Sequence, residues 1–212
     1  MRVLRARTVA AVLGAMLMLP LVTSCALLES PAPEPTKAVL NKMPAEVPQR
    51  AMQAGVLVVF PPQTQAVYDT TRMAYSVKPY EVAYFARHEW GETPAQMLQP
   101  LLIGTLQETR AFAAVLASPY PGRYNYALRT EIRELIADFS AEPAALQLSL
   151  RFVLSEGGAG RVLATREVSI REPLQEKSPY GNVVAANNAT AKALLELAKF
   201  VLEKASSPAA SS

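Results

Sequence analysis

Apolar residues in the first half of the chain predict strands that come before a helix. Residues 55–60 form one continuous apolar and β-branched run that ends at two prolines, which is typical of a strand buried on both faces. Further extended segments are predicted at 72–76 and 80–85. In the last of these, alternate residues predict one half-buried face: Tyr80, Val82 and Tyr84.

The strongest local signal in the chain marks the start of a helix at Thr93-Pro94-Ala95-Gln96. It combines a hydroxyl N-cap, a proline at the first helical position and a glutamine that closes a capping box. Apolar residues then recur every three or four positions, which predicts one face turned to a core: Met97, Leu98, Leu101, Leu102 and Leu106. We expect this helix to end near Thr109.

The second half of the chain continues with strands and closes with a helix. Extended segments are predicted at residues 112–116, 126–139, 146–154 and 162–170, and a glycine-rich turn makes the last two an antiparallel hairpin. An alanine-rich amphipathic segment predicts a helix over 182–204. This order predicts an α+β fold, in which two main helices pack on one face of a mixed, mostly antiparallel sheet.

The amino-terminal segment has the order of an export signal. Three arginines precede an apolar stretch over residues 9–22, which ends at Thr23-Ser24-Cys25. Residues 21–25 resemble the bacterial lipobox, in which the cysteine accepts the lipid. Cys25 is the one cysteine of the chain, so it has no disulfide partner within it.

We therefore expect residues 1–24 to be a lipoprotein signal peptide and Cys25 to be the lipidation site, which would carry fatty acyl groups such as palmitate. Ala26, where inner-membrane retention would favour Asp, points to the outer membrane by resemblance to lipoprotein sorting. Two alternatives stay open, namely an ordinary signal peptide with a free thiol and an uncleaved anchor helix.

Removal of the signal peptide changes the charge balance of the chain. It takes three of the 21 basic residues and no acidic residue, which leaves 18 basic against 18 acidic side chains. A neutral exported domain offers no basic patch for nucleic acid. We therefore expect no nucleic-acid partner.

Composition divides the exported chain into three parts. Residues 25–53 are rich in proline, which predicts a lipidated spacer in extended conformations, although its second half could instead dock on the domain. Residues 54–204 are long enough for one domain with its own core. Residues 205–212 are expected to form a disordered tail.

Residues that could carry catalysis or bind a metal are scarce. His88 is the one histidine, and the position one helical turn later is Glu92, so a zinc-protease pair is lacking. No Gly-x-Ser-x-Gly elbow is present, and the glycines at 157–160 are not followed by the Lys-Ser/Thr of a phosphate loop. We therefore predict no catalytic residue, no metal site, no cofactor and no enzymatic activity.

Aromatic residues gather between positions 68 and 90. Their apolar bodies and polar tips suit a sheet edge that receives a partner, and we take four of them as candidate partner-binding residues: Tyr75, Tyr80, Tyr84 and Trp90. The alternative is that they fill the core and its rim.

One pattern in the chain resembles a known family. It runs from Arg72-x-Ala74-Tyr75 through the segment 80–90, which ends in Trp90, to Thr93-Pro94, and it returns at Ala185-Ala186-Asn187-x-Ala189. The pattern resembles the ABC-type transport auxiliary lipoproteins, which accompany lipid carriers with mammalian-cell-entry (MCE) domains, and it is similar to the lipoprotein of the paraquat-inducible operon.

This resemblance implies a non-enzymatic accessory on the periplasmic face of the outer membrane. Its partners would be an MCE-domain protein and its ABC permease and ATPase, and its cargo would be phospholipid or sterol. The oligomeric state stays open. The alternative function is that of an outer-membrane lipoprotein which activates or scaffolds a cell-wall synthase or another envelope complex.

Overall fold

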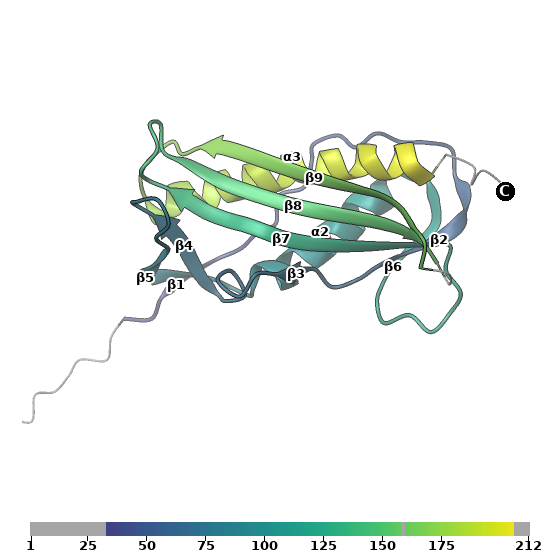
Figure 1. The fold of residues 1–212 in the computed structure, drawn as a ribbon, viewed down its shortest axis with the longest axis horizontal. Coiled ribbons are helices and arrows are strands. Elements are labelled where there is room, and N and C mark those ends of the chain that lie inside the picture. Colours follow the sequence, from purple (N-terminus) through teal and green to yellow (C-terminus); the bar gives the residue numbers. More distant parts are fainter. Residues whose placement is uncertain (1–32, 158–159, 206–212) are drawn as a thin grey trace, which may run out of the picture. The chain divides into compact units, whose positions relative to one another are not determined.

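The computed structural model of the protein describes residues 33–157 and 160–205 (Figure 1). Within them, one mixed sheet packs against two helices, which confirms the predicted α+β fold. The elements are β1 Thr36–Ala38, β2 Gln53–Val59, β3 Gln63–Thr64, β4 Arg72–Ser76, β5 Ala83–Trp90, α2 Pro94–Glu108, β6 Phe112–Ala117, β7 Tyr126–Asp138, β8 Ala145–Glu156, β9 Val162–Pro173 and α3 Pro179–Ala205. Cys25, the predicted signal peptide and residues 206–212 lie outside the described residues.

Strand β7 organises the sheet. One of its edges pairs antiparallel with β8 over the full length of both strands, and β8 pairs in the same way with β9. The other edge pairs in succession with β2, β3 and β4, all of them parallel. Strand β6 lies beyond β2, and β5 and then β1 lie beyond β4. The longest ladders are thus antiparallel, as predicted.

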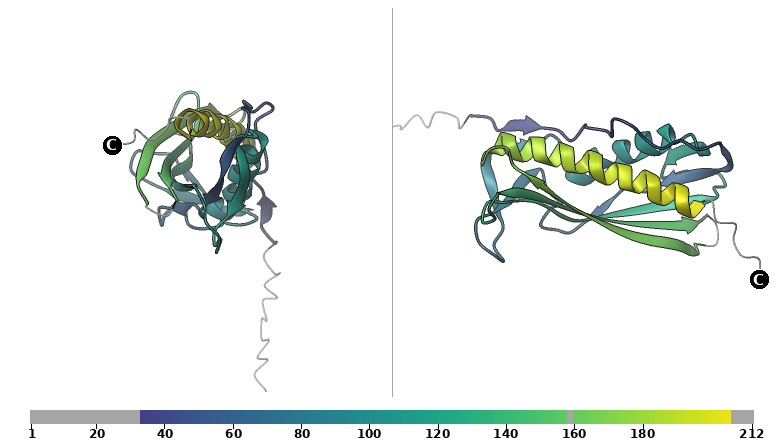
Figure 2. Two further views of the ribbon diagram at one scale, coloured as in Figure 1. Left: turned by 90° about the vertical axis from the view of Figure 1, so that its right-hand side faces the viewer. Right: turned by 90° about the horizontal axis from the view of Figure 1, so that it is seen from above.

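The predicted alternation of apolar and polar residues in β8 places one face of this strand in the core. Leu146, Leu148, Leu150, Phe152 and Leu154 are all buried. Helix α3 packs on β7, β8 and β9, while α2 packs on β2 and β6, and the two helices also contact each other on this face of the sheet (Figure 2). Their apolar sides and the inner faces of the strands form one continuous core.

Helix α2 begins and ends where the sequence predicts. The Thr93 hydroxyl accepts a hydrogen bond from the backbone N–H of Gln96, and the Gln96 side chain accepts one from the N–H of Thr93, which completes the capping box. At the other end Thr109 is the C-cap, and Arg110 then takes a left-handed conformation with φ of 56°. The chain can therefore turn sharply into β6.

Helix α3 starts three residues earlier than the predicted Asn182. The Ser178 hydroxyl accepts a hydrogen bond from the N–H of Gly181 at 2.9 Å, and Pro179 occupies the first helical position. This Ser-Pro pair is the same start signal as Thr93-Pro94, and its side-chain acceptor satisfies a backbone donor that has no partner inside the helix.

The predicted strand at 80–85 is displaced towards the carboxyl end. Strand β5 begins at Ala83 and continues to Trp90, while residues 77–82 form a turn in which Tyr80 has φ of 68° and a fully exposed side chain. Tyr80, Val82 and Tyr84 therefore do not share one face of a strand. The sequence alternation was misleading because two of these three residues lie in the turn.

Residues 36–50, which we name the strap, dock on the domain. Strand β1 pairs parallel with β5, Leu40 is buried in the main core, and the strap runs beside α3 and past α2 (Figure 2, right). The second half of the predicted spacer therefore takes the docked alternative, and the domain begins near Glu34 rather than at residue 54. Proline limits regular pairing but still allows Leu40 and Met43 to fill the space between the helices.

The apolar stripes of the two helices face this core. Among the residues that the structure describes, neither helix is both long and apolar enough to cross a bilayer.

Candidate functional site

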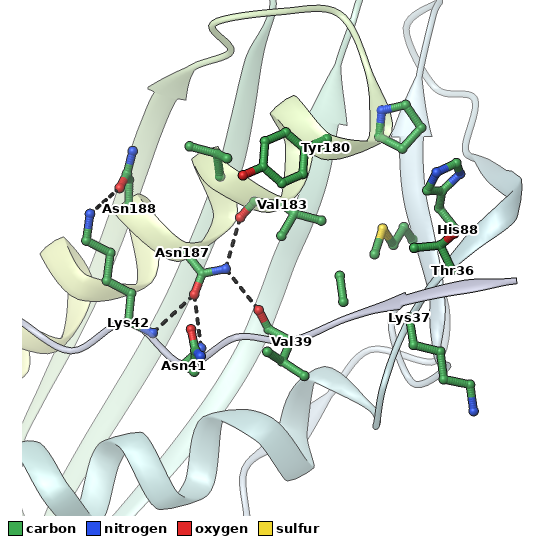
Figure 3. Close-up of a pocket in the computed structure, with 14 residues that line it drawn as sticks. Thr36, Lys37, Val39, Asn41, Lys42, His88, Tyr180, Val183, Asn187 and Asn188 are labelled. Atoms are coloured by element: carbon green, nitrogen blue, oxygen red, sulfur yellow. Dashed lines mark hydrogen bonds between the residues drawn. The ribbon is translucent and has the colours of Figure 1, made fainter.

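A groove of about 660 Å³ lies between the strap and the first turns of α3 (Figure 3). The strap, including β1, forms one wall, and the amino-terminal part of α3 forms the other. It is lined by Thr36, Lys37, Ala38, Val39, Asn41, Lys42, Met73, His88, Pro179, Tyr180, Val183, Val184, Asn187 and Asn188. Its volume is within the range of about 300 to 1,000 Å³ that is usual for small-molecule sites.

Asn187 holds the two walls of the groove together. Its side-chain nitrogen donates to the backbone oxygens of Val39 at 2.9 Å and Val183 at 3.0 Å. Its side-chain oxygen accepts from the backbone N–H groups of Asn41 at 2.9 Å and Lys42 at 3.1 Å. The strap has left the sheet at this point, so one amide side chain supplies the hydrogen bonds that a neighbouring strand would give.

The interior of the groove is apolar. Met73 on β4 is almost fully buried beneath it, and Ala38, Val183 and Val184 line its sides. Tyr180, at the start of α3, is 71% exposed at the opening. An apolar interior with an aromatic residue at the edge suits an apolar ligand better than a polar one.

Three nitrogen-bearing titratable residues line the groove, namely Lys37, Lys42 and His88. Lys37 lies on β1, and Lys42 donates from Nζ to the side-chain oxygen of Asn188 at 2.6 Å. His88 lies on β5, opposite Thr36 in the parallel ladder. None of the residues that line the groove is acidic. The Lys37 side chain extends away from the groove (Figure 3), on the face of β1 where Glu89 stands opposite it in the ladder.

Two of the four aromatic residues proposed from sequence are held inside the fold. Trp90 is only 2% exposed and belongs to the main core, next to the strap. Tyr84 is partly buried, donates from its hydroxyl to the backbone oxygen of Val67 at 2.8 Å and carries the Arg72 guanidinium 4.1 Å above its ring. These contacts give both residues structural roles, so a partner could reach Trp90 only if the strap moved.

The other two aromatic candidates lie elsewhere. The Tyr75 ring stacks 4.6 Å from that of Phe85 and 5.7 Å from that of Phe139, whereas Tyr80 extends from the β4–β5 turn into solvent. Tyr84 pairs with the position before Tyr75, so the two rings lie on opposite faces of the ladder. The structure does not bring the four residues together on one surface.

The groove residues were missed by sequence reasoning, although a signal for one of them was present. Asn187 belongs to the motif at 185–189, where it is a polar residue on an alanine-rich helix. Its role depends on the strap, which is 145 or more residues away in sequence. His88 was considered as a zinc ligand, and within the described residues no His, Cys, Asp and Glu side chains cluster so as to hold a metal ion.

The most perturbed titratable groups lie outside the groove. Burial, reinforced by the negative charge of Glu134, raises the pKa of Tyr68 to about 12, so its phenol stays protonated at neutral pH. Burial also raises the pKa of Glu134, with a smaller contribution from Asp138. Hydrogen bonds from Ser140 lower the pKa of Asp138. This cluster contains no nucleophile beside a base, the arrangement expected of a covalent catalyst.

The fold is shared with solved structures, of which two align well. A Xanthomonas campestris protein of the DUF330 family aligns with a TM-score of 0.69 at 19% identity, over 80% of this chain and 95% of its own. A second protein, described only as uncharacterized, aligns with a TM-score of 0.64 at 14% identity, over 80% of this chain and 99% of its own. At these identities the likeness shows the fold alone.

Among curated proteins no match was found. Residues 39–198 match the family described as the ABC-type transport auxiliary lipoprotein component. The match begins inside the strap, just after β1, and ends in α3. It confirms the resemblance carried by the motifs at 72–94 and 185–189. The description implies a membrane-anchored protein of the cell envelope with an accessory role in transport. The chain belongs to the family of ABC-type transport auxiliary lipoproteins.

Proposed function

We propose that the protein is a periplasmic lipoprotein of the outer membrane and a non-catalytic accessory of an ABC-type lipid transport system that contains an MCE-domain protein. The family match carries the accessory role, and the lipobox-like segment ending at Cys25 supports the anchor. The cargo would be a phospholipid or a sterol. The description of the family as auxiliary supports a non-catalytic role.

The docked strap shortens the connection between domain and bilayer. Eight residues, 26–33, lie between Cys25 and Glu34, where the compact domain begins. The nine Cα-to-Cα steps from Cys25 to Glu34 span at most about 30 Å when fully extended. A domain joined to its membrane by so short a segment has a high local concentration there. A weak contact between the domain and the carrier then suffices to keep them together.

A transport accessory of this kind has a clear physical purpose. Each methylene group that a lipid exposes to water costs about 0.8 kcal/mol, so lipid crosses the periplasm only along a continuous apolar path. An anchored domain can hold the end of that path at the membrane. No step of this role requires a bond to be made or broken.

The partner is tested by crosslinking intact cells and purifying the protein with its native anchor. We expect the MCE-domain protein to be recovered, together with its permease and ATPase. Recovery of a cell-wall synthase without an MCE protein would replace the proposal by the alternative function.

The anchor is tested by Cys25→Ser, with Ser30→Ala as a control in the same segment. A hydroxyl cannot replace the thiol as the acyl acceptor, so we expect radiolabelled palmitate on the control and none on Cys25→Ser. Separation of the two membranes by density should then place the acylated protein in the outer fraction. Label on Cys25→Ser would overturn the anchor assignment, and an inner-membrane position would overturn the choice of membrane.

A further inference from the structure

Exposed apolar side chains gather at one end of the sheet, which we name the turn end after the β4–β5 turn, residues 77–82. Strand pairing places four strand ends side by side there, namely Ser76, Asp138, Ala145 and Pro173. Helix α3 starts at the same end, shortly after β9 stops (Figure 1). Of the seven large apolar side chains that are exposed in the described residues, four lie at the turn end: Val77, Tyr80, Val82 and Tyr180. Such a concentration indicates a contact outside the fold.

The β4–β5 turn holds three of these side chains on a fixed base. The Ser76 hydroxyl donates to the backbone oxygen of Lys78 at 2.6 Å, and the N–H of Glu81 donates to the same oxygen at 3.3 Å. Below the turn the rings of Tyr75 and Phe85 stack at 4.6 Å. The turn thus satisfies part of its own backbone hydrogen bonding, which lowers the cost of moving it out of water.

Tyr80 is an unusual residue for its position in the turn. Its φ of 68° lies in the left-handed region, where glycine and asparagine are favoured and a bulky side chain is uncommon. The side chain is fully exposed, so its packing does not offset this backbone strain. A large aromatic residue that is strained and gains nothing from the fold points to a function outside it.

The segment that leads to Cys25 enters the domain from the turn end. Strand β1 runs parallel to β5, and β5 begins at Ala83 directly after the turn, so the chain before Thr36 leads back towards the turn end. In Figures 1 and 2, β1 and the start of α3 lie at one end and the carboxyl end of α3 lies at the other. The connection from Cys25 to Glu34 spans at most about 30 Å. Because the 27 residues of α3 add about 40 Å, the turn end reaches the bilayer more readily than the opposite end.

We propose that the β4–β5 turn contacts the bilayer that holds Cys25, with Tyr80 at the level of the lipid head groups and Val77 and Val82 against the first acyl methylenes. The inference rests on the lipid anchor of the proposed function and goes beyond it by fixing how the domain faces its membrane. Tyrosine suits the interface because its ring is apolar and its tip is polar. The two charges of the turn, on Lys78 and Glu81, have opposite signs, so the contact is shallow and depends on apolar groups.

This contact would direct the opposite end of the domain, with the β8–β9 hairpin, into the periplasm. A carrier protein or a second copy of the chain could also cover an apolar turn. The bilayer is favoured because the anchoring segment enters at the same end and keeps the turn within reach of lipid at all times.

The test measures tryptophan fluorescence of the acylated protein in phosphatidylcholine vesicles. Trp90 is the one tryptophan of the chain and is 2% exposed, so it gives a constant background. In Tyr80→Trp, we expect lipid brominated near the head of its acyl chains to quench the new fluorescence, and acrylamide in the water to quench it several-fold less than in Val162→Trp. Val162 is exposed at the opposite end, beside the β8–β9 hairpin, so this control should respond to acrylamide alone. Equal responses of the two variants, or no quenching by brominated lipid in Tyr80→Trp, would overturn the proposal.

Further changes in the Tyr80→Trp protein show whether the whole turn makes the contact. Val77→Asp with Val82→Asp should restore quenching by acrylamide, because carboxylates are costly at the level of the acyl chains. Met52→Asp changes a side chain that is 70% exposed and lies next to β2, away from the turn end, and should leave the shielding intact. All of these side chains are exposed, so the melting temperatures should match that of the Tyr80→Trp protein. Shielding that survives both aspartates would overturn the proposal.

The same measurement identifies the other occupants. Shielding from acrylamide without quenching by brominated lipid would mean that another copy of the chain covers the turn, and it would overturn the proposal. The purified protein needs its acyl groups but neither carrier nor cargo. Failure to recover an MCE partner from cells would therefore overturn the transport role and leave the membrane contact standing. Absence of bromine quenching in protein whose acylation is confirmed by mass would overturn the membrane contact alone.

Discussion

The two halves of helix α3 use the same amphipathic pattern for different purposes. In the carboxyl-terminal half Leu194, Leu197, Phe200 and Val201 are at most 1% exposed and belong to the main core. In the amino-terminal half Val183 and Val184 keep part of their surface open to the groove, and Tyr180 is largely exposed. One half thus buries its apolar surface within the fold, while the other leaves part of its apolar surface exposed in the groove.

The two halves also differ in how they hold their neighbours. The carboxyl-terminal half is held by close packing on the sheet, which gains free energy in proportion to the area removed from water. The amino-terminal half holds the strap mainly through the hydrogen bonds of one asparagine. Such bonds contribute about 1 kcal/mol each, and they add to the burial of Leu40 and the pairing of β1 with β5.

The largest effect is expected in the packed half. Phe200→Ala removes a fully buried ring and leaves a cavity that the surrounding core cannot close, so the free energy of unfolding should fall by about 3 to 5 kcal/mol. Denaturant unfolding followed by circular dichroism measures it. Tyr180→Ala, an aromatic deletion on the exposed half of the same helix, is the control and should change stability by less than about 0.5 kcal/mol. Similar losses of unfolding free energy in both variants would mean that the two halves of α3 do not differ in how they stabilise the fold.

An intermediate effect is expected at Asn187, whose side chain holds the strap against α3. Asn187→Ala leaves the N–H groups of Asn41 and Lys42 and the oxygen of Val39 without their side-chain partner, which should cost about 1 to 3 kcal/mol. Amide hydrogen exchange should speed up in the strap and stay unchanged in β8. Asn188→Ala, which loses only the bond from Lys42, is the matched control. Fast exchange in the strap of the control variant as well would show that the strap is not held specifically by Asn187.

A smaller effect is expected where the strap meets the carboxyl-terminal end of α3. Arg50 donates from Nη1 to the backbone oxygen of Leu202 at 2.7 Å, and a cation near the last carbonyls of a helix also interacts favourably with its dipole. Arg50→Ala should lower the free energy of unfolding by about 0.5 to 1.5 kcal/mol and leave exchange at Asn41 unchanged. The exposed Arg123→Ala is the control. Exchange that rises along the whole strap would mean that its two ends open together.

Elements with a complete local signal were predictable from the sequence. The Thr93-to-Gln96 capping box fixed the start of α2 because all of its partners lie within four residues. The alternation of β8 predicted its buried face because that strand runs unbroken beside two others. Each of these patterns depends on the chain over one short stretch, so composition and spacing were sufficient.

The groove could not be predicted because its parts are distant in sequence. The strap looked like a spacer because its prolines exclude a regular pattern, and its hydrogen bonds come from α3 and not from a neighbouring strand. Trp90 was predicted to bind a partner because the sequence around an aromatic residue at the end of a strand does not show whether another segment of the chain covers its side chain. Burial became visible only once β1 was placed on β5.

The smallest effect is expected at Glu134, which lies outside the groove and to which no binding role is assigned. Glu134 has a raised pKa because burial disfavours its charged form, so the folded state holds the proton more tightly than the unfolded state. As pH rises from the ordinary value of 4.5 through the raised pKa, the wild type loses stability that Glu134→Gln retains. The variant should therefore match the wild type at acidic pH and be more stable, by less than about 0.5 kcal/mol, at neutral pH.

Glu142→Gln is the matched control with the opposite sign. A hydrogen bond from Lys177 and its positive charge lower the pKa of Glu142, so this carboxylate contributes stability above its ordinary pKa and loses it as the pH falls. This variant should be slightly less stable than the wild type at neutral pH and equal to it in acid. Melting temperatures across the pH range measure both slopes. Parallel curves for the two variants would mean that neither carboxylate is linked to folding, and that polar contacts away from the groove are energetically neutral.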